Sequence, residues 1–119
     1  MVDKLQSAQA LEIWRRTLVE TVRRDEPDLS ARQLAVLLTV YMTPPPHTVR
    51  GLAAALGISK PAVTRALDRL GTLDFLRRKT DETDRRNVLV QRTVRGSVFL
   101  RDFADLVCES SADALADVS

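Results

Sequence analysis

The stretch from Thr48 to Leu70 constrains the fold most strongly, because it has the pattern of two short helices joined by a glycine turn. Thr48 can cap the first helix, and Gly57 can end it by taking the left-handed conformation that follows many helix ends. Ser59 can cap the second helix. Pro61 then falls in the first turn, where a missing backbone N–H leaves no helical hydrogen bond unmade. This spacing predicts a helix-turn-helix.

The residues that follow this motif predict a β-hairpin. Residues 75–79 and 87–92 have strand character, and the intervening TDETDRR is rich in threonine and aspartate, which suit a hairpin tip. A hairpin directly after a helix-turn-helix is a wing. The predicted fold class is therefore mainly α with a small β-hairpin, a winged helix-turn-helix flanked by N- and C-terminal helices.

Helices are expected on both sides of this core. Residues 5–24 carry apolar side chains at helical spacing and are followed by the helix-stopping DEPD. A second helix begins at Ser30, where Gln33 completes a capping box, and TPPPH ends it. Thr93 can cap a last helix, which we expect to weaken near residues 110–111.

We predict a single domain over residues 1–119. Its parts are an N-terminal dimerisation helix (1–27), a DNA-binding core (28–92), and a C-terminal dimerisation helix with an acidic tail (93–119). The distribution of charged residues also differs between these parts. Residues 48–101 hold 12 basic and 5 acidic side chains, whereas residues 102–119 hold 5 acidic and no basic ones. A polyanion contact is therefore expected in the middle segment.

The outward face of the helix that begins after Ser59 is the first candidate DNA-binding surface. An α-helix fits the major groove of B-form DNA, where arginine can bond guanine and threonine or proline can touch a thymine methyl. A solvated helix face with no partner is the alternative interpretation. The predicted contacts on this helix are Ser59, Lys60, Pro61, Thr64, Arg65 and Arg69.

The wing is the second candidate surface. Arg85 or Arg86 at its tip could enter a minor groove, with Asp84 orienting the guanidinium. The alternative is a solvated turn with weak local ion pairs. Phosphate contacts are predicted for three side chains at the hairpin base, Arg77, Arg78 and Lys79.

These segments together resemble a known family. The stretches DLSARQLAVLL, TVRGLAAALGISKPAVTRALDRL and DETDRRNVLVQRTVRG are similar to the MarR family of bacterial winged-helix transcription regulators, over roughly residues 28–100. The resemblance implies a homodimer on a pseudo-palindromic operator, with recognition helices in successive major grooves and wings in the flanking minor grooves.

The chain departs from that family's pattern at two positions. Where members usually have glycine before the first wing strand, this chain has Asp74, which can still adopt a left-handed conformation. Where members have leucine before the last helix, it has Arg92, so we expect locally different packing there.

The resemblance also implies dimerisation through the terminal helices. About 26 residues follow Thr93, so we expect one helix and a stub, and hence a reduced or rearranged dimer interface. The alternative for its apolar side chains is an intramolecular core. The predicted dimer contacts are Leu11, Trp14, Leu18, Phe99, Phe103 and Leu106.

Other partners and activities are less well supported by the sequence. Relatives bind phenolic or lipophilic effectors, and Trp14, Tyr41 and Met42 could line such a pocket. Redox sensing by Cys108 is disfavoured by its acidic neighbours, and His47 is expected to be a loop residue.

We predict no enzyme, no cofactor, no metal, no membrane contact and a cytoplasmic, nucleoid-associated location. The alternative function from another class is a winged-helix adaptor that binds a protein and has weak or no affinity for DNA.

Overall fold

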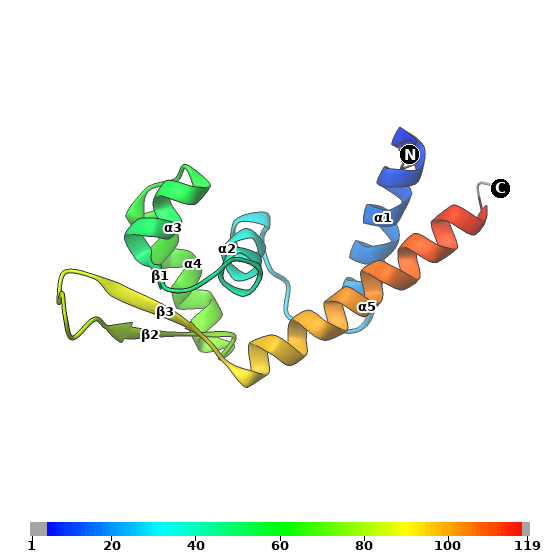
Figure 1. The fold of residues 1–119 in the computed structure, drawn as a ribbon. Coiled ribbons are helices and arrows are strands. Elements are labelled where there is room, and N and C mark those ends of the chain that lie inside the picture. The colour runs from blue at the N-terminus through cyan, green and yellow to red at the C-terminus, as the bar shows by residue number, and fades with distance from the viewer. Residues whose placement is uncertain (1–4, 118–119) are drawn as a thin grey trace. The chain divides into compact units, whose positions relative to one another are not determined.

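The computed structural model describes residues 5–117, which divide into two units (Figure 1). One unit consists of residues 29–99, and the other of residues 5–28 together with 100–117. Within the described residues, five α-helices and a three-stranded sheet are present. The predicted fold class is confirmed, whereas the prediction of a single domain stays a prediction.

The three helices that lie wholly within the 29–99 unit each begin at a side-chain hydroxyl. Ser30 Oγ accepts a hydrogen bond from the Gln33 N–H at 3.1 Å, and the Gln33 side chain accepts in return from the Ser30 N–H. The hydroxyls of Thr48 and Ser59 each accept an equivalent hydrogen bond from the backbone N–H three residues ahead, at 2.9 and 3.2 Å. Each bond satisfies an N–H group that has no partner within the helix. The helices are α2 (Ala31–Met42), α3 (Val49–Leu56) and α4 (Lys60–Thr72).

The core of this unit lies where these helices meet the sheet. Leu37, Leu52, Leu67 and Leu70 are at most 1% exposed. Gly57 ends α3 with a φ of 65°, as its position in the sequence predicts. The buried faces of α3 and α4 therefore leave one polar side of α4 directed outward.

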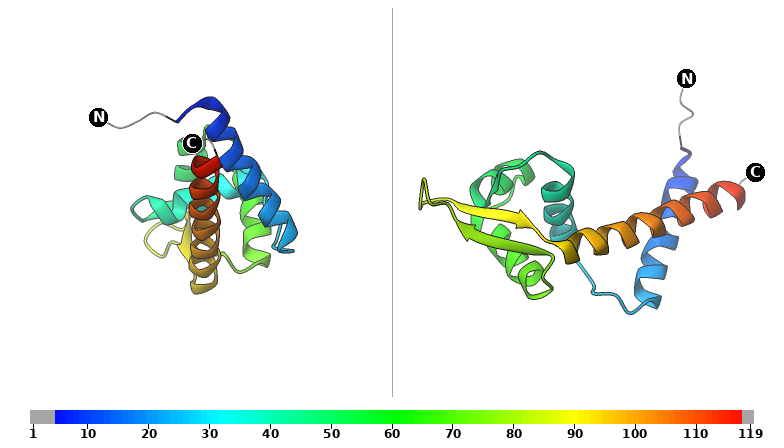
Figure 2. Two further views of the ribbon diagram at one scale, coloured as in Figure 1. Left: turned by 90° about the vertical axis from the view of Figure 1, so that its right-hand side faces the viewer. Right: turned by 60° about the horizontal axis from the view of Figure 1, so that its bottom comes forward.

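The sheet has one strand more than the predicted hairpin. β2 (Leu76–Thr80) and β3 (Val88–Arg92) pair antiparallel as expected, and β1 (His47–Thr48) pairs with the other edge of β3. The strand order is β1-β3-β2. Figure 2 shows the β2–β3 hairpin extending beyond α3 and α4. Since β1 follows the triple proline directly, the extended path that prolines impose also supplies this short strand.

The turn between α4 and β2 confirms the conformation expected for Asp74. Its φ is 58°, in the left-handed region that aspartate tolerates better than most residues other than glycine. The Asp74 backbone oxygen accepts a hydrogen bond from the Thr93 hydroxyl at 2.6 Å. This bond ties the start of the wing to the residue that precedes the last helix.

The Tyr41 hydroxyl joins three segments of the same unit. It lies 2.8 Å from the Phe75 carbonyl oxygen and 3.0 Å from that of Thr93, and it accepts a bond from the Thr93 N–H at 2.9 Å. Gly96 packs against this cluster so closely that an added Cβ would lie 2.0 Å from the Tyr41 hydroxyl oxygen. We call these residues, Tyr41, Phe75, Thr93 and Gly96, the Tyr41 junction.

The second unit contains α1 (Ser7–Arg23) and the larger part of α5 (Val94–Asp117). The prediction that the last helix weakens near residues 110–111 is wrong, because α5 continues to Asp117. Ser110 is only 4% exposed, so packing holds the helix at the point where two serines lower its intrinsic propensity. Within the described residues, no helix is long and apolar enough to span a bilayer.

Candidate nucleic-acid interface

The exposed side of α4 carries every side chain that the sequence predicts for the major groove. Ser59, Lys60, Pro61, Thr64, Arg65 and Arg69 are all exposed. The opposite side of the helix is buried, with Val63, Leu67 and Leu70 at 0–1% exposure. Since the buried side fixes the rotation of α4, the structure presents this cationic face outward.

An ion pair connects α4 to the base of the wing. Arg78 Nη2 on β2 lies 2.7 Å from Asp68 Oδ1 on α4, and both side chains are partly exposed. Arg77 pairs more loosely with Asp74, at 3.7 Å. The sequence predicted a phosphate contact for Arg78, and its ion pair with Asp68 was not foreseen. A phosphate contact by Arg78 would compete with, or extend, its bond to Asp68.

At the wing tip, Asp84 holds the guanidinium of Arg86. Asp84 Oδ1 accepts from Arg86 Nε at 3.0 Å, and Oδ2 accepts from Nη2 at 3.1 Å. This paired, charge-assisted bond lowers the pKa of Asp84 below its ordinary value. Arg85 is exposed beside the pair and makes no ion pair with any described residue. The tip therefore offers one oriented and one unpaired guanidinium.

The turn itself is shaped by a second aspartate. Asp81 Oδ1 accepts hydrogen bonds from the backbone N–H and the hydroxyl of Thr83, at 3.0 and 2.7 Å. These bonds lower the pKa of Asp81. Such local bonds are the reason that aspartate and threonine suit turns, so the acidic residues of the tip support its shape.

Two cationic side chains near this surface were missed by sequence analysis. Arg50, exposed in the first turn of α3, lies near enough to Asp84 for its charge to lower the pKa of that carboxyl. Arg32 on α2 and Arg65 on α4 line one shallow groove of about 200 Å³. The Thr48 cap could have indicated Arg50, because it places that residue on an exposed side of the first turn.

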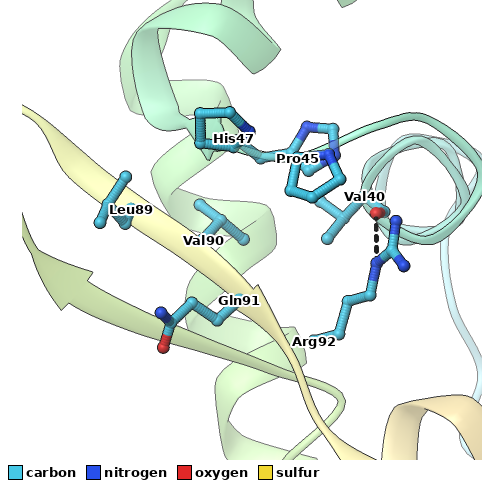
Figure 3. A pocket seen from close by; sticks show the side chains of 8 residues that line it. Val40, Pro45, His47, Leu89, Val90, Gln91 and Arg92 are labelled. Atoms are coloured by element: carbon cyan, nitrogen blue, oxygen red, sulfur yellow. Dashed lines mark hydrogen bonds between the residues drawn. The ribbon is translucent and has the colours of Figure 1, made fainter.

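The structure shows how Arg92 is accommodated at the position where family members usually have leucine (Figure 3). Its Nε donates to the Val40 carbonyl oxygen at 2.9 Å, and its Nη2 donates to that of Thr43 at 3.0 Å. The guanidinium carbon also lies 5.7 Å from the centre of the Tyr41 ring. Arg92 thus binds the carboxyl end of α2, where free carbonyl groups favour a cation.

The predicted dimer contacts differ in their exposure. Leu11, Trp14 and Leu18 on α1 are 70%, 56% and 51% exposed, so the intramolecular-core alternative is wrong for these three. Leu106 is 4% exposed, and Phe99 stacks on Phe75 with ring centroids 4.4 Å apart. That packing within the chain favours the core alternative for Leu106 and Phe99. Phe103 is half-buried, and the dimer assignment as a whole stays a prediction.

The remaining candidate groups form no reactive cluster in residues 5–117. Cys108 is exposed, and the described residues contain no group of three or more His, Cys, Asp or Glu side chains that could hold a metal ion. The prediction that His47 is a loop residue is wrong, because His47 is the first residue of β1 and pairs with Val90. Its Nε2 lies 3.1 Å from the Thr43 carbonyl oxygen.

Comparisons with known proteins agree with this geometry. The model of the MarR family matches residues 28–87, just over half of the chain. A variant of MepR from S. aureus superimposes with a TM-score of 0.75 at 18% identity, covering 98% of this chain and 86% of the other. CouR, a transcriptional repressor bound to a 23-mer DNA duplex, gives 0.72 at 22% identity, covering 98% and 87%. The S. aureus MepR–DNA complex gives 0.73 at 19% identity, covering 92% and 86%.

The family match spans all of α2, α3, α4 and β2 and reaches the wing tip, which together hold the predicted DNA-binding side chains. The structural matches cover the same elements and extend to the terminal helices. The chain therefore belongs to the MarR family of DNA-binding transcriptional regulators.

Proposed function

We propose that this chain binds double-stranded DNA at specific sequences, with α4 in a major groove and the β2–β3 wing at an adjacent minor groove. The observation that carries the proposal is the exposed side of α4, which holds Lys60, Thr64, Arg65 and Arg69 on a helix whose other side is buried. Arginine and threonine can form the donor and methyl contacts that distinguish base pairs in the major groove. Base reading is therefore assigned to Thr64 and Arg65.

Positioning on the DNA backbone is assigned to the wing and to side chains around α4. Arg85 and Arg86 suit a narrow minor groove, where the negative potential is concentrated. Lys79, Arg77 and Arg50 are exposed and suit phosphate groups. Contacts of this kind set affinity and register, whereas the α4 contacts set sequence preference.

The proposal predicts a strong dependence of binding on salt. Each neutralised phosphate releases condensed counterions, so log K should fall linearly with log salt with a slope of about −0.9 per contact. Fluorescence anisotropy of labelled random-sequence duplex at four or more salt concentrations measures this slope. We expect a slope steeper than about −4, since more than four exposed cations surround α4 and the wing.

The same titration tests the alternative function. A protein-interaction adaptor of this fold would show no saturable binding to duplex DNA even at low salt. In that case we would expect the +7 charge of residues 48–101 to bind an acidic protein surface instead. Saturable, steeply salt-dependent binding would contradict the adaptor function.

We further propose that two copies associate through α1. Its exposed stripe of Leu11, Trp14, Leu18 and Val22 is an apolar face on a charged helix. A two-fold dimer would present two α4 helices to half-sites about 34–36 Å apart, one turn of the DNA helix. A pseudo-palindromic operator would match that symmetry.

Trp14→Glu should weaken self-association at least about 30-fold, because a buried tryptophan that anchors an interface typically contributes 2 kcal/mol or more. Sedimentation velocity over a concentration series measures the dimer dissociation constant. Val94→Glu provides a matched control, since Val94 is 83% exposed and lies outside the predicted set. Equal sedimentation of both variants and the unaltered chain would contradict an α1 interface.

A cytoplasmic, nucleoid-associated location follows from this proposal, because a regulator must share the compartment of its DNA. Binding of a small-molecule effector is also part of the proposal. The proposed activity is binding, and no catalytic step is assigned to any residue.

A further inference from the structure

Asp68 lies on the exposed side of α4, among the side chains that the proposed function assigns to DNA. It follows Thr64 by four residues and Arg65 by three, so the three side chains share one face of the helix. We propose that Asp68 is a further specificity-determining residue, which accepts a hydrogen bond from the N4 amino group of a cytosine in the major groove. This inference rests on the proposed function, because it names part of the DNA sequence that α4 recognises.

A carboxylate on this face has a cost in affinity. The phosphate groups of DNA repel it, so its charge weakens binding to every duplex. The Asp68 side chain is nevertheless 60% exposed. The other polar side chains on this face of α4 are cationic or neutral, namely Lys60, Thr64, Arg65 and Arg69. What Asp68 adds to a face rich in hydrogen-bond donors is a strong acceptor.

Arg78 on β2 holds this acceptor in place. Arg78 Nη2 donates to Asp68 Oδ1 at 2.7 Å, a short charge-assisted bond. Asp68 Oδ2 has no hydrogen-bond partner among residues 5–117. The carboxylate is therefore oriented through one oxygen and open at the other. The positive charge of Arg78 also offsets part of the repulsion between Asp68 and the phosphate groups.

The chemistry of a carboxylate selects cytosine among the four bases. An ionised carboxylate can only accept hydrogen bonds. In the major groove, guanine presents two acceptors, and thymine presents one acceptor and a methyl group. Adenine presents an amino group beside the N7 acceptor, whereas cytosine presents its amino group alone. Asp68 therefore favours cytosine and disfavours the other three bases at the position it contacts.

Asp68 and Arg65 are spaced to contact neighbouring base pairs. Three residues of an α-helix rise about 4.5 Å along its axis, and successive base pairs of B-form DNA are about 3.4 Å apart. Arginine suits the O6 and N7 of guanine. Each half-site of the operator is therefore expected to contain two adjacent G·C pairs, one contacted at its guanine by Arg65 and one at its cytosine by Asp68.

A purely structural role of the bond between Asp68 and Arg78 gives different results. If the bond only holds the wing beside α4, its loss weakens binding to all duplexes alike, and Asp68→Ala behaves as Arg78→Ala does. If Asp68 contacts cytosine, Asp68→Ala weakens binding to the operator alone. Random DNA is then bound at least as tightly as before, because a negative charge has been removed from the interface.

Changes to single cytosines test the proposal on the unaltered chain. An operator is first selected by the protein from a library of random duplexes. Each cytosine of one half-site is then replaced in turn by N4-methylcytosine, which still pairs with guanine but carries a methyl group in place of the amino hydrogen that faces the major groove. We expect one of these replacements to weaken binding about tenfold, the typical effect of losing a base contact, and the others to leave it nearly unchanged.

A pair of variants assigns that contact to its residue. Asp68→Ala should bind the operator and the sensitive N4-methylcytosine duplex with equal affinity, since the acceptor is gone. Arg78→Ala is the matched control, because it breaks the same ion pair but keeps the carboxylate. It should weaken binding to all duplexes alike and remain sensitive to the methylated cytosine. Circular dichroism spectra that match those of the unaltered chain show that both variants are folded.

Two results would overturn the proposal: equal losses of Asp68→Ala on operator and random DNA, or no cytosine in the half-site at which methylation weakens binding of the unaltered chain. The second result needs no variant, so it is decisive even if Asp68→Ala fails to fold. Failure of the proposed function would be a different observation, the absence of saturable binding to any duplex, and it would overturn this inference as well.

Discussion

Replacing Gly96 with alanine is expected to lower the free energy of unfolding by about 3 kcal/mol or more. The added Cβ would lie 2.0 Å from the Tyr41 hydroxyl oxygen and 2.3 Å from the backbone oxygen of Phe75. The tyrosine could move only by giving up its bonds to Phe75 and Thr93. The Phe75 carbonyl belongs to the main chain at the start of the wing, so α5 or the wing would have to shift.

Urea denaturation followed by circular dichroism measures this effect. Gly71→Ala is the matched control, because Gly71 is a helical glycine with no heavy atom within 4 Å of an added Cβ. That substitution should be neutral or should stabilise the fold by up to about 1 kcal/mol. If Gly96→Ala proved as stable as the unaltered chain, the close packing of the Tyr41 junction would be wrong.

Replacing Arg65 with alanine should reduce discrimination between operator and random DNA by about 1–3 kcal/mol, or roughly 5–150-fold. Arg65 lies on the exposed side of α4, and a bidentate bond from arginine to guanine is the commonest base-specific contact. Loss of such a bond removes affinity from the operator alone. Loss of a phosphate contact would weaken all duplexes alike.

The measurement begins with an operator selected by the unaltered protein from a library of random duplexes. Affinities for this operator and for random DNA are then compared at one salt concentration. Arg101→Ala removes the same charge from α5 at a position that is not among the proposed DNA contacts, and it should leave the ratio unchanged. Equal losses of Arg65→Ala on both duplexes would show that Arg65 contacts the backbone rather than a base.

The predictions that succeeded depend on local chemistry. A hydroxyl cap needs only its own side chain and an N–H three residues ahead, so the starts of α2, α3 and α4 could be placed from Ser30, Thr48 and Ser59. The glycine at the end of α3 and the strands of the wing are likewise encoded within a few residues. The outward face of α4 could also be predicted, because the apolar residues on its buried side recur at helical spacing.

The predictions that failed depend on partners distant in the sequence. β1 has two residues and exists because His47 and Thr48 pair with Val90 and Leu89. The continuity of α5 past Ser110 reflects packing that overrides the weak helical propensity of serine. Arg92 was expected to alter the local packing, but its bond to the end of α2, across 52 positions of sequence, could not be foreseen.

In the candidate site, too, some features depend on local sequence and others on partners that are distant in the sequence. The residue types on α4 and at the wing tip were sufficient to predict which side chains would be exposed and cationic. The bond between Arg78 and Asp68 and the charge of Arg50 near Asp84 depend on how β2 and α3 lie beside other elements. Sequence spacing alone does not define those distances.

The role of the Ser59 hydroxyl as the cap of α4 limits the hydrogen bonds that it can still make to DNA. A serine hydroxyl has one hydrogen to donate and two lone pairs to accept with. One lone pair already accepts the Ala62 N–H at 3.2 Å, so the hydrogen is directed elsewhere. Ser59 is therefore suited to donate to a phosphate oxygen or to the O6 or N7 of guanine, and less suited to accept from the amino group of cytosine. In the proposed DNA complex, the residue that fixes where α4 begins is therefore expected to act as a hydrogen-bond donor.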